Sequence, residues 1–447
     1  MLVTNPFFLA AVCLLSVLLH VWRSLASPLR RIPGSTISLF SSWVLKYHEF
    51  HANRTRYVHQ LHLKHGPVVR IAPNEVSFAS LDGVREIYGS GGSGYDKTEF
   101  YNLFTVHGRS LTAWDPGEIE EVRREMLGFF WVERLHDYAF DCVTHHLFEP
   151  YGSDSLRNPT DEEIMRQVTS DGSLQNRLVA YYSPGLHKVM GGVLSLFAEP
   201  RATPLADNFV MAATAKTGPA QFTLLNRMQD KAHGLEHLDM AAECTDHMVA
   251  GIDTTGDALC FLMWEISQPR SFSVQQRLQE ELRANPETPT DKLPYLDAVV
   301  NEGLRCFPAI PMSLPRYVPD GGRTIDGYFL PEKTIVSCQA YSAHRINESV
   351  FPQPDLFNPG RWLEEKGELD RKRLFFAFAS GGRGCVGKHL AVAEMKTLLR
   401  DVYSRFMTVP DDSMTEEDME MSDLLISTQP KGKKCHMRFL PLEAGKV

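Results

Sequence analysis

The sequence predicts a mainly α-helical fold with small β-sheets, preceded by one N-terminal transmembrane helix. Helical periodicity of the apolar residues covers most of the chain up to about residue 308. Short runs rich in β-branched residues surround a turn at Pro73-Asn74 and recur after residue 311, which indicates small sheets. The chain opens with an uncharged, apolar stretch over Leu2–Trp22, which predicts the membrane helix.

The composition is that of a folded globular protein. The chain has 447 residues, 43% of them hydrophobic, and 46 Lys+Arg against 55 Asp+Glu give a net charge of −9. This profile excludes disorder and coiled coil. Because contacts to phosphate supply most non-specific affinity, a negative chain without a long basic run is not expected to bind nucleic acid. The eight cysteines include no C-x-x-C pair, which argues against a zinc module and a disulfide framework.

Residues 1–27 are predicted to be a membrane anchor. Leu2–Trp22 contains no Asp, Glu, Lys or Arg, and roughly 20 such residues span a bilayer core as a helix. The first cation, Arg23, follows the apolar stretch, so the positive-inside rule places the bulk of the chain in the cytosol. Ser24-Leu25-Ala26 resembles a weak cleavage site, but a signal peptide normally begins with positive charge and this chain does not.

Residues 28–447 are predicted to form one folded domain. Prolines make the segment after the anchor a stiff connector, because each proline fixes φ and stops a helix. The elements expected after it are a helix over 41–65, a hairpin over 67–79, mainly helix up to about 308, short strands over 311–363 and a helix over about 387–406.

The most informative stretch is Phe378–Gly387, in which glycines surround Cys385 just before a predicted helix. Glycines let the backbone fold closely around the thiol. Because a helix N-terminus stabilises negative charge, we expect the pKa of Cys385 to be lowered and its thiolate to ligate a metal. Arg383 lies two residues earlier, where it is placed to pair with an anionic group.

The spacing Phe-x-x-Gly-x-Arg-x-Cys-x-Gly over 378–387 resembles the haem-binding signature of the cytochrome P450 superfamily. Glu302-Gly-Leu-Arg305 is similar to that family's E-x-x-R pair, and Ala250–Thr255 is similar to its oxygen-activation motif. A buried Arg–carboxylate pair is costly unless a network completes it, and the third member would be Arg361. The resemblance covers nearly the whole chain after the anchor and is strongest to membrane-anchored filamentous-fungal enzymes of secondary metabolism.

The resemblance implies the cytochrome P450 fold and a heme b cofactor whose iron is ligated by Cys385. It also implies that Asp253 and Thr254 deliver protons to bound oxygen. As packing alone, an unpaired Asp and Thr inside an apolar helix would be destabilising. The other implied site residues are Arg123, Arg316 and Arg383 at the haem propionates, Phe378, Gly381 and Gly387 in the cofactor loop, and Glu302, Arg305 and Arg361 as a structural triad.

The sequence departs from the family pattern at three places. Gly360 stands where the family usually has Glu beside Arg361. Ile119 stands four residues before Arg123, where the family usually has Trp or His. The region Phe129–Asp141 is too short to hold a helix that the family has there, so we expect either a compact member or a mis-spliced gene model.

The function implied by the resemblance is that of a monooxygenase, which inserts one oxygen atom from O2 into a hydrophobic small molecule of fungal secondary metabolism. Electrons would come from a separate NADPH-cytochrome P450 reductase docking near Lys388, Arg371 and Arg373, at the endoplasmic reticulum membrane with the catalytic domain facing the cytosol. Two alternatives stay open. One is an oxygen-independent isomerase or dehydratase, against which the intact Asp253-Thr254 pair argues. The other is a truncated, non-catalytic or haem-free remnant.

Overall fold

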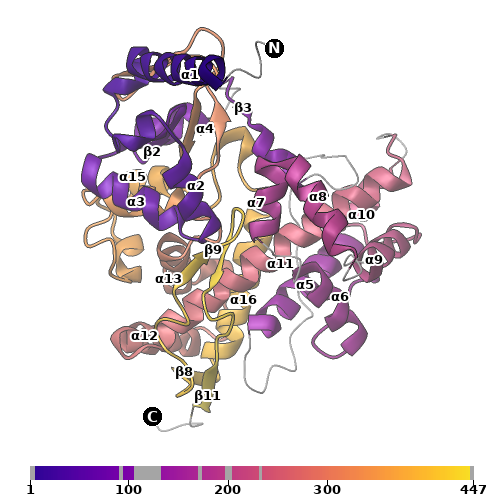
Figure 1. Ribbon diagram of the computed structural model, residues 1–447. Helices are drawn as coiled ribbons and strands as arrows, with labels where there is room; N and C mark the ends of the chain where they lie inside the picture. The colour runs from indigo at the N-terminus through magenta and orange to yellow at the C-terminus, as the bar shows by residue number, and fades with distance from the viewer. Residues whose placement is uncertain are drawn as a thin grey trace. The chain divides into compact units, whose positions relative to one another are not determined.

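The computed structural model describes residues 6–89, 94–104, 132–169, 174–196, 204–230 and 234–442. The chain forms two compact units, each built from segments far apart in the sequence (Figure 1). The segments are Met1–Phe100, Met312–Pro354 and Asp370–Gly384 for unit 1, and Tyr101–Pro311, Asp355–Leu369 and Cys385–Val447 for unit 2.

Helices dominate and the sheets are small, as the sequence predicts. Unit 1 contains α1 (Pro6–Ala26), α2 (Trp43–Phe50), α3 (Arg54–His65), α4 (Leu81–Tyr88) and α14 (Ala340–Ile346). Unit 2 contains α5 (Val132–Phe148), α6 (Pro159–Thr169), α7 (Leu174–Tyr182), α8 (Pro184–Leu194), α9 (Pro204–Thr214), α10 (Leu224–Met228), α11 (His237–Ser267), α12 (Phe272–Ala284), α13 (Pro294–Cys306) and α16 (Lys388–Tyr403). Helix α15 (Glu368–Leu374) runs through the point at which the chain passes from unit 2 to unit 1.

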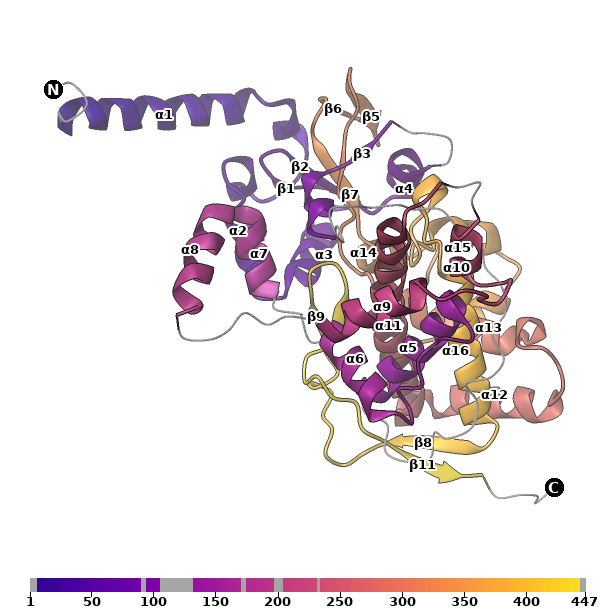
Figure 2. The same cartoon turned by 90° about the vertical axis from the view of Figure 1, so that its right-hand side faces the viewer.

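A five-stranded sheet organises unit 1. Its order is β1-β2-β7-β4-β3, with β2 and β7 parallel and the other neighbours antiparallel. The smaller sheets are antiparallel strand pairs. Strand β5 pairs with β6 in unit 1, and in unit 2 β8 pairs with β11 and β9 with β10 (Figure 2). The strands are β1 (Val68–Ala72), β2 (Glu75–Phe78), β3 (Asp96–Lys97), β4 (Arg316–Tyr317), β5 (Arg323–Ile325), β6 (Tyr328–Leu330), β7 (Ile335–Cys338), β8 (Phe406–Pro410), β9 (Met421–Asp423), β10 (Thr428–Pro430) and β11 (Met437–Pro441).

Arg70 ties the proline-rich connector to the sheet of unit 1. Its side chain is buried, and its guanidinium donates to the carbonyls of Leu29, Ile32 and Ser35 at 3.0–3.1 Å. Leu29 lies in a short 3-10 helix over Pro28–Arg31, and its carbonyl also accepts the backbone N–H of Ile32. A buried cation is stable only when its donors are used, so the pairing fixes both the connector and β1.

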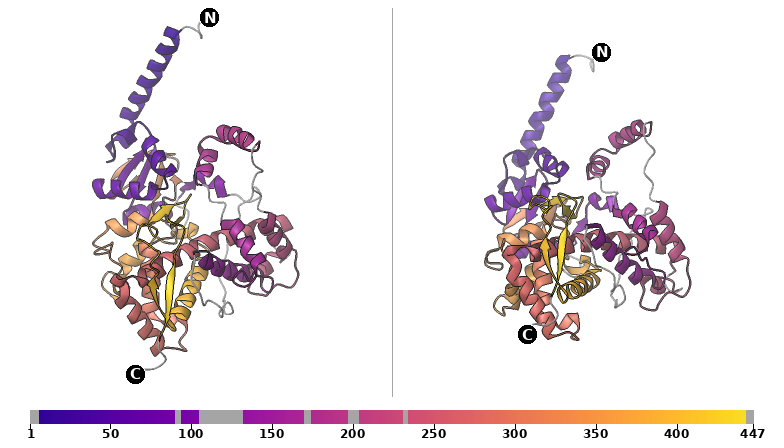
Figure 3. Two further views of the ribbon diagram at one scale, coloured as in Figure 1. Left: turned by 60° about the horizontal axis from the view of Figure 1, so that its bottom comes forward. Right: turned by 90° about the horizontal axis from the view of Figure 1, so that it is seen from below.

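The membrane anchor expected over residues 1–27 is not supported. A helix does form there as α1 (Figure 3). Apolar side chains such as those of Phe7, Leu14 and Trp22 are exposed on it. In the part of the chain that the structure describes, however, no helix combines the length and the apolar character needed to cross a membrane.

Helix α11 forms the centre of unit 2, where α5 packs against it (Figure 1). One apolar cluster joins α5, α6, α9, α10 and α11, with Phe140 and Phe148 of α5 beside Met248 and Ile252 of α11. Burial of each such side chain contributes about 1.5–3 kcal/mol. The helix expected to begin near 387 is confirmed, as α16 begins at Lys388. In the described part of Phe129–Asp141 the chain forms one helix, α5, which runs on without a break to Phe148.

Candidate functional site: a cysteine at a helix start beside a polar α11

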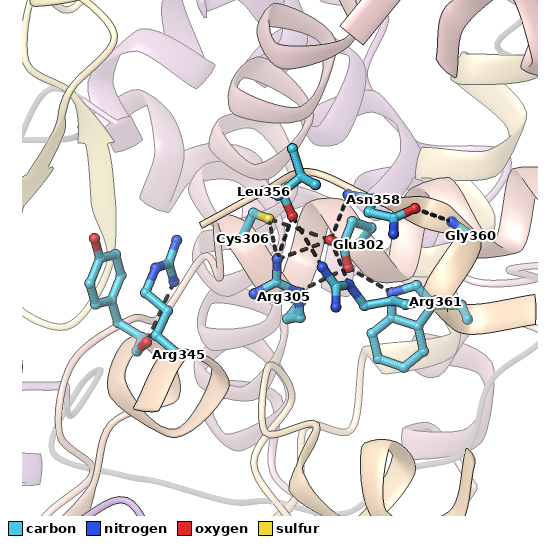
Figure 4. A network of polar contacts seen from close by, with 10 residues as sticks. Glu302, Arg305, Cys306, Arg345, Leu356, Asn358, Gly360 and Arg361 are labelled. Carbon is cyan, nitrogen blue, oxygen red and sulfur yellow. Dashed lines mark hydrogen bonds and ion pairs between the residues drawn. The ribbon is translucent and has the colours of Figure 1, made fainter. Parts of the chain in front are cut away.

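Glu302 contacts the other two residues of the predicted structural triad, Arg305 and Arg361 (Figure 4). Its carboxylate lies on α13 and is fully buried, together with the guanidinium of Arg305 one turn later. Arg305 donates to both carboxylate oxygens at 2.9 Å, and Arg361 donates to Oε1 through Nε at 3.0 Å. Each guanidinium group offsets part of the hydration that the carboxylate loses on burial.

The segment that follows Pro354 completes this network without the carboxylate that Gly360 replaces. The backbone N–H of Asn358 and the indole Nε1 of Trp362 each donate to Glu302 at 2.9 Å. Arg305 and Arg361 also donate to the carbonyl of Leu356 at 3.2 Å. Backbone and indole groups therefore satisfy the triad, and the segment is held against α13.

Cys385 stands immediately before α16, and Gly387 is the N-cap of that helix. Apart from Cys13 it is the only exposed cysteine, since the other six are buried. The described residues hold no group of three or more His, Cys, Asp or Glu side chains that could bind a metal ion. A metal at Cys385 would therefore take its other ligands from a bound group, and an exposed thiol as sole protein ligand fits a haem.

The expected lowering of the Cys385 pKa is wrong. Burial by the surrounding protein raises the pKa of this thiol, although one side of the residue is open to solvent. The backbone N–H groups of Gly387 and Lys388 donate to the sulfur, and the charge of Lys388 lies near it, which offsets only part of the increase. The helix start acts as expected on the thiol, but desolvation is the larger effect.

The glycines around Cys385 do not all serve one purpose. Gly381, in unit 1, has φ +64°, and a Cβ there would lie 2.1 Å from the carbonyl oxygen of Tyr88. Only glycine fits this close approach. Gly387, in unit 2, would place a Cβ 4.0 Å from the Cys385 sulfur, in ordinary contact, so its role is not steric.

Asp253 and Thr254 lie together in the middle of α11. The Thr254 hydroxyl donates to the carbonyl of Ala250 at 2.6 Å, while Asp253 Oδ1 is buried without a hydrogen-bond partner. Burial raises the pKa of Asp253 to about 6, even though the charges of His136 and Arg177 lower it. Close to neutral pH this carboxyl therefore exchanges protons readily, which suits a general acid or base.

Two contacts connect this part of α11 to the helix that begins after Cys385. Leu390, in the first turn of α16, packs against the apolar cluster that contains Met248 and Ile252. Farther along, Thr255 shares a hydrogen bond with Glu394, a buried carboxyl whose pKa burial raises to about 8. The start of α16 and the polar centre of α11 consequently belong to one packed region of unit 2.

The remaining predicted residues lie elsewhere. Arg316, Phe378, Gly381 and Arg383 belong to unit 1, and Arg123 lies outside the described residues. Arg316 is buried, with its guanidinium 5.2 Å from the centre of the Tyr88 ring. Arg371 was expected on an exposed docking surface, but it is buried, so that expectation is wrong.

Sequence reasoning missed two titratable residues of this region, His136 of α5 and Glu394 of α16. His136 lies 3.3 Å from Asp257. Glu394 is buried and shares a hydrogen bond with Thr255. The recurrence of Asp one turn after Asp253 was the available signal, because two acids on one face of an apolar helix require a partner.

Comparison with known proteins identifies relatives over nearly the whole chain. The family model described as Cytochrome P450 matches residues 206–437. Cytochrome P450 monooxygenase orf2 of Aspergillus niger is 30% identical over 481 aligned positions, which cover 94% of the chain and 95% of the relative. Cytochrome P450 monooxygenases stcB of Emericella nidulans and aflV of Aspergillus parasiticus are 28% and 25% identical, covering 92% of the chain in both cases and 88% and 92% of the relatives.

The alignment to the Aspergillus niger relative also bears on the length of the chain. Its 481 positions exceed the 447 residues of the chain by 34, so the relative has residues where this chain has none. That the missing residues fall at Phe129–Asp141 stays a prediction.

Substitution of Glu302 tests the energetic weight of the triad. Because Glu302→Gln removes the buried negative charge that both Arg305 and Arg361 contact, we expect a loss of about 3–5 kcal/mol of unfolding free energy, measured by urea denaturation. Glu162→Gln is the matched control, since its partner Arg166 is 46% exposed and such a surface pair contributes about 0.3–0.5 kcal/mol. Equal losses for the two variants would contradict this interpretation of the network.

Proposed function

Since the chain belongs to the cytochrome P450 family, we propose that it is a haem-thiolate monooxygenase in which Cys385 ligates the iron of heme b. Its relatives are P450 monooxygenases, and the family binds haem through a cysteine thiolate. The observation that carries the proposal for this chain is the exposed thiol of Cys385 at the start of α16, with two backbone N–H groups donating to it.

Haem, when bound, supplies oxygen activation, which a thiolate ligand favours by pushing electron density toward the iron. The protein must keep the sulfur ionised, and the N–H groups of Gly387 and Lys388 serve that purpose. Coordination of the Cys385 sulfur to iron would displace the proton that burial otherwise retains on the thiol. The raised pKa of the free thiol is therefore compatible with a bound thiolate.

Asp253 and Thr254 are proposed to move protons within the site. The Asp253 carboxyl has a pKa of about 6 and a buried oxygen without a partner, so it can hold a proton and release it near neutral pH. Thr254 bonds the carbonyl of Ala250 with its hydrogen, which leaves the hydroxyl lone pairs available to a donor. The oxygen-independent isomerase or dehydratase is disfavoured by the same pair.

The propionate contacts proposed are Arg123, Arg316 and Arg383. Arginine suits this role because its planar guanidinium binds carboxylates in bidentate fashion. Phe378 and Gly381 are proposed to line the cofactor loop, and the close approach at Gly381 supports a tightly folded backbone there. The triad of Glu302, Arg305 and Arg361 is proposed as structural, a role that its complete burial supports.

The partners proposed are a separate NADPH-cytochrome P450 reductase and a hydrophobic substrate from fungal secondary metabolism. Lys388 is exposed beside Cys385 and provides a cation for the reductase. We also propose that the protein works at the endoplasmic reticulum membrane, with its catalytic domain facing the cytosol. The exposed apolar side chains of α1, among them Leu14 and Leu18, support association with that membrane.

Replacement of Cys385 tests the proposed iron ligand. The full chain, expressed in membranes, reduced and exposed to carbon monoxide, is expected to give a difference spectrum with its Soret band at the thiolate position. Cys385→Ala should abolish that band, while Cys13→Ala, which removes the other exposed cysteine, should retain it. A band retained in Cys385→Ala would contradict the ligand assignment, and a wild-type chain without haem would favour the haem-free remnant.

Replacement of the polar pair tests the proton-moving role. Since general acid–base groups contribute about 10²–10⁴-fold, Asp253→Asn and Thr254→Val are each expected to slow NADPH-driven oxygen consumption by about 10²-fold or more. Thr245→Val is the matched control, because Thr245 lies on the same helix and bonds the carbonyl four residues earlier in the same way, at 2.9 Å. Unchanged rates in both site variants would contradict the role.

A further inference from the structure

A second charged contact lies beside the proposed proton-moving pair. Asp257 is one turn after Asp253 on α11, so both carboxyls occupy the same face of the helix. His136 of α5 meets this face, with its Nε2 atom 3.3 Å from Asp257 Oδ1. All three side chains are largely buried, and Asp257 is 2% exposed.

The packing of α5 on α11 is shaped around the imidazole. A Cβ added at Gly256 would lie 2.1 Å from Cδ2 of His136. The ring therefore rests against the backbone of α11, between the turns that carry Asp253 and Asp257. A larger residue at 256 would therefore displace the ring from this position and from Asp257.

Asp253, Asp257 and His136 form a cluster of buried charged groups, and the charged groups in and around this cluster come from three helices. Asp253 and Asp257 stand on α11, His136 and Asp137 on α5, and Arg177 on α7. The carboxylate of Asp257, together with those of Asp253 and Asp137, raises the pKa of His136 to about 9 despite its burial. The imidazole is therefore a cation at neutral pH.

This cation acts on Asp253 more strongly than Asp257 does. Of the charges near Asp253, His136 has the largest effect and lowers the pKa of the carboxyl, while Asp257 raises it by less and Arg177 lowers it by less still. Loss of the imidazolium therefore raises the pKa of Asp253 whether Asp257 remains ionised or takes up a proton. The effect has the same sign in both cases.

We propose that His136 is a positioning residue for Asp253, and that its imidazolium, fixed by Asp257 and by the close approach at Gly256, holds the Asp253 carboxyl ionised in its buried site. The inference rests on the proposed function, in which Asp253 moves protons. His136 touches neither substrate nor cofactor in this account. A purely structural ion pair would contribute stability but would leave the proton affinity of Asp253 unchanged.

The test is an infrared pH titration of the purified full chain, which requires no turnover. The carbonyl band of the protonated Asp253 carboxyl is assigned by its absence in Asp253→Asn, and its midpoint in the wild type is expected near pH 6. In His136→Gln the midpoint should rise by about 1–3 pH units, the size of the effect that a nearby opposite charge exerts. His136→Asn, which is smaller than histidine, covers the case in which the Gln variant does not fold.

Two further variants separate charge from structure. His136→Lys keeps the cation and should return the midpoint toward the wild-type value. His247→Gln removes a histidine that also pairs with a carboxylate of α11, at 3.1 Å from Glu243, and should leave the midpoint unchanged. An unchanged midpoint in the folded neutral variants at 136 would overturn the proposal.

The pH dependence of oxygen consumption tests whether His136 affects the reaction through Asp253. If oxygen consumption needs ionised Asp253, the rate falls as the pH drops through its pKa, and this acidic limb should move to higher pH in His136→Gln, together with the infrared midpoint. A shifted infrared midpoint with an unshifted rate profile would overturn the positioning role. Full activity in Asp253→Asn would instead contradict the proposed function, whatever the infrared result.

Discussion

The carboxylate of Glu302 is completely buried, so it must be bound by hydrogen-bond donors. This requirement fixes the positions of the segments of unit 2 on which Cys385 depends. A lone buried carboxylate costs several kcal/mol, so the chain must supply donors to it from more than one segment. Arg305 comes from the same helix, while Asn358, Arg361 and Trp362 come from the segment after Pro354. That segment has little regular structure, and the carboxylate fixes its position.

The position of α13, which carries Glu302, also determines the position of α16, the helix that begins after Cys385. Within unit 2, α13 packs on both α11 and α16. Lys396 of α16 forms an ion pair with Asp297 of α13 at 2.6 Å, which adds a polar contact to the apolar ones. The position of the first turn of α16, and with it the Cys385 thiol, is thus determined by a helix whose own surroundings are organised around Glu302.

The centre of α11 carries polar groups where packing alone would favour apolar ones. Thr255 and Asp257 are buried, and Asp253 has an oxygen atom without a partner. Such groups cost free energy unless they are paired, and His136 and Glu394 reduce that cost for Asp257 and Thr255. A buried oxygen atom that stays without a partner, as at Asp253, is typical of a residue retained for its chemistry.

Local patterns predicted much of this arrangement, and long-range contacts account for the rest. Periodicity located the start of α16 to within one residue, and the resemblance to the family's motifs predicted Glu302, Arg305 and Arg361 as one network. The pKa of Cys385 was predicted wrongly, because a helix N-terminus is visible in sequence whereas desolvation by distant segments is not. For the same reason Arg371 was placed on the surface, and His136, about 120 residues from Asp257, was not identified.

The most direct test of the account is the ratio of iron to protein in the purified full chain and in Cys385→Ala. This ratio depends on neither the substrate nor the reductase, and it distinguishes a haem-binding enzyme from a haem-free remnant. We predict about one haem iron per chain in the wild type and a large loss of iron in the variant. A wild-type chain that is folded but free of iron, or a variant that retains the full amount, would contradict the account.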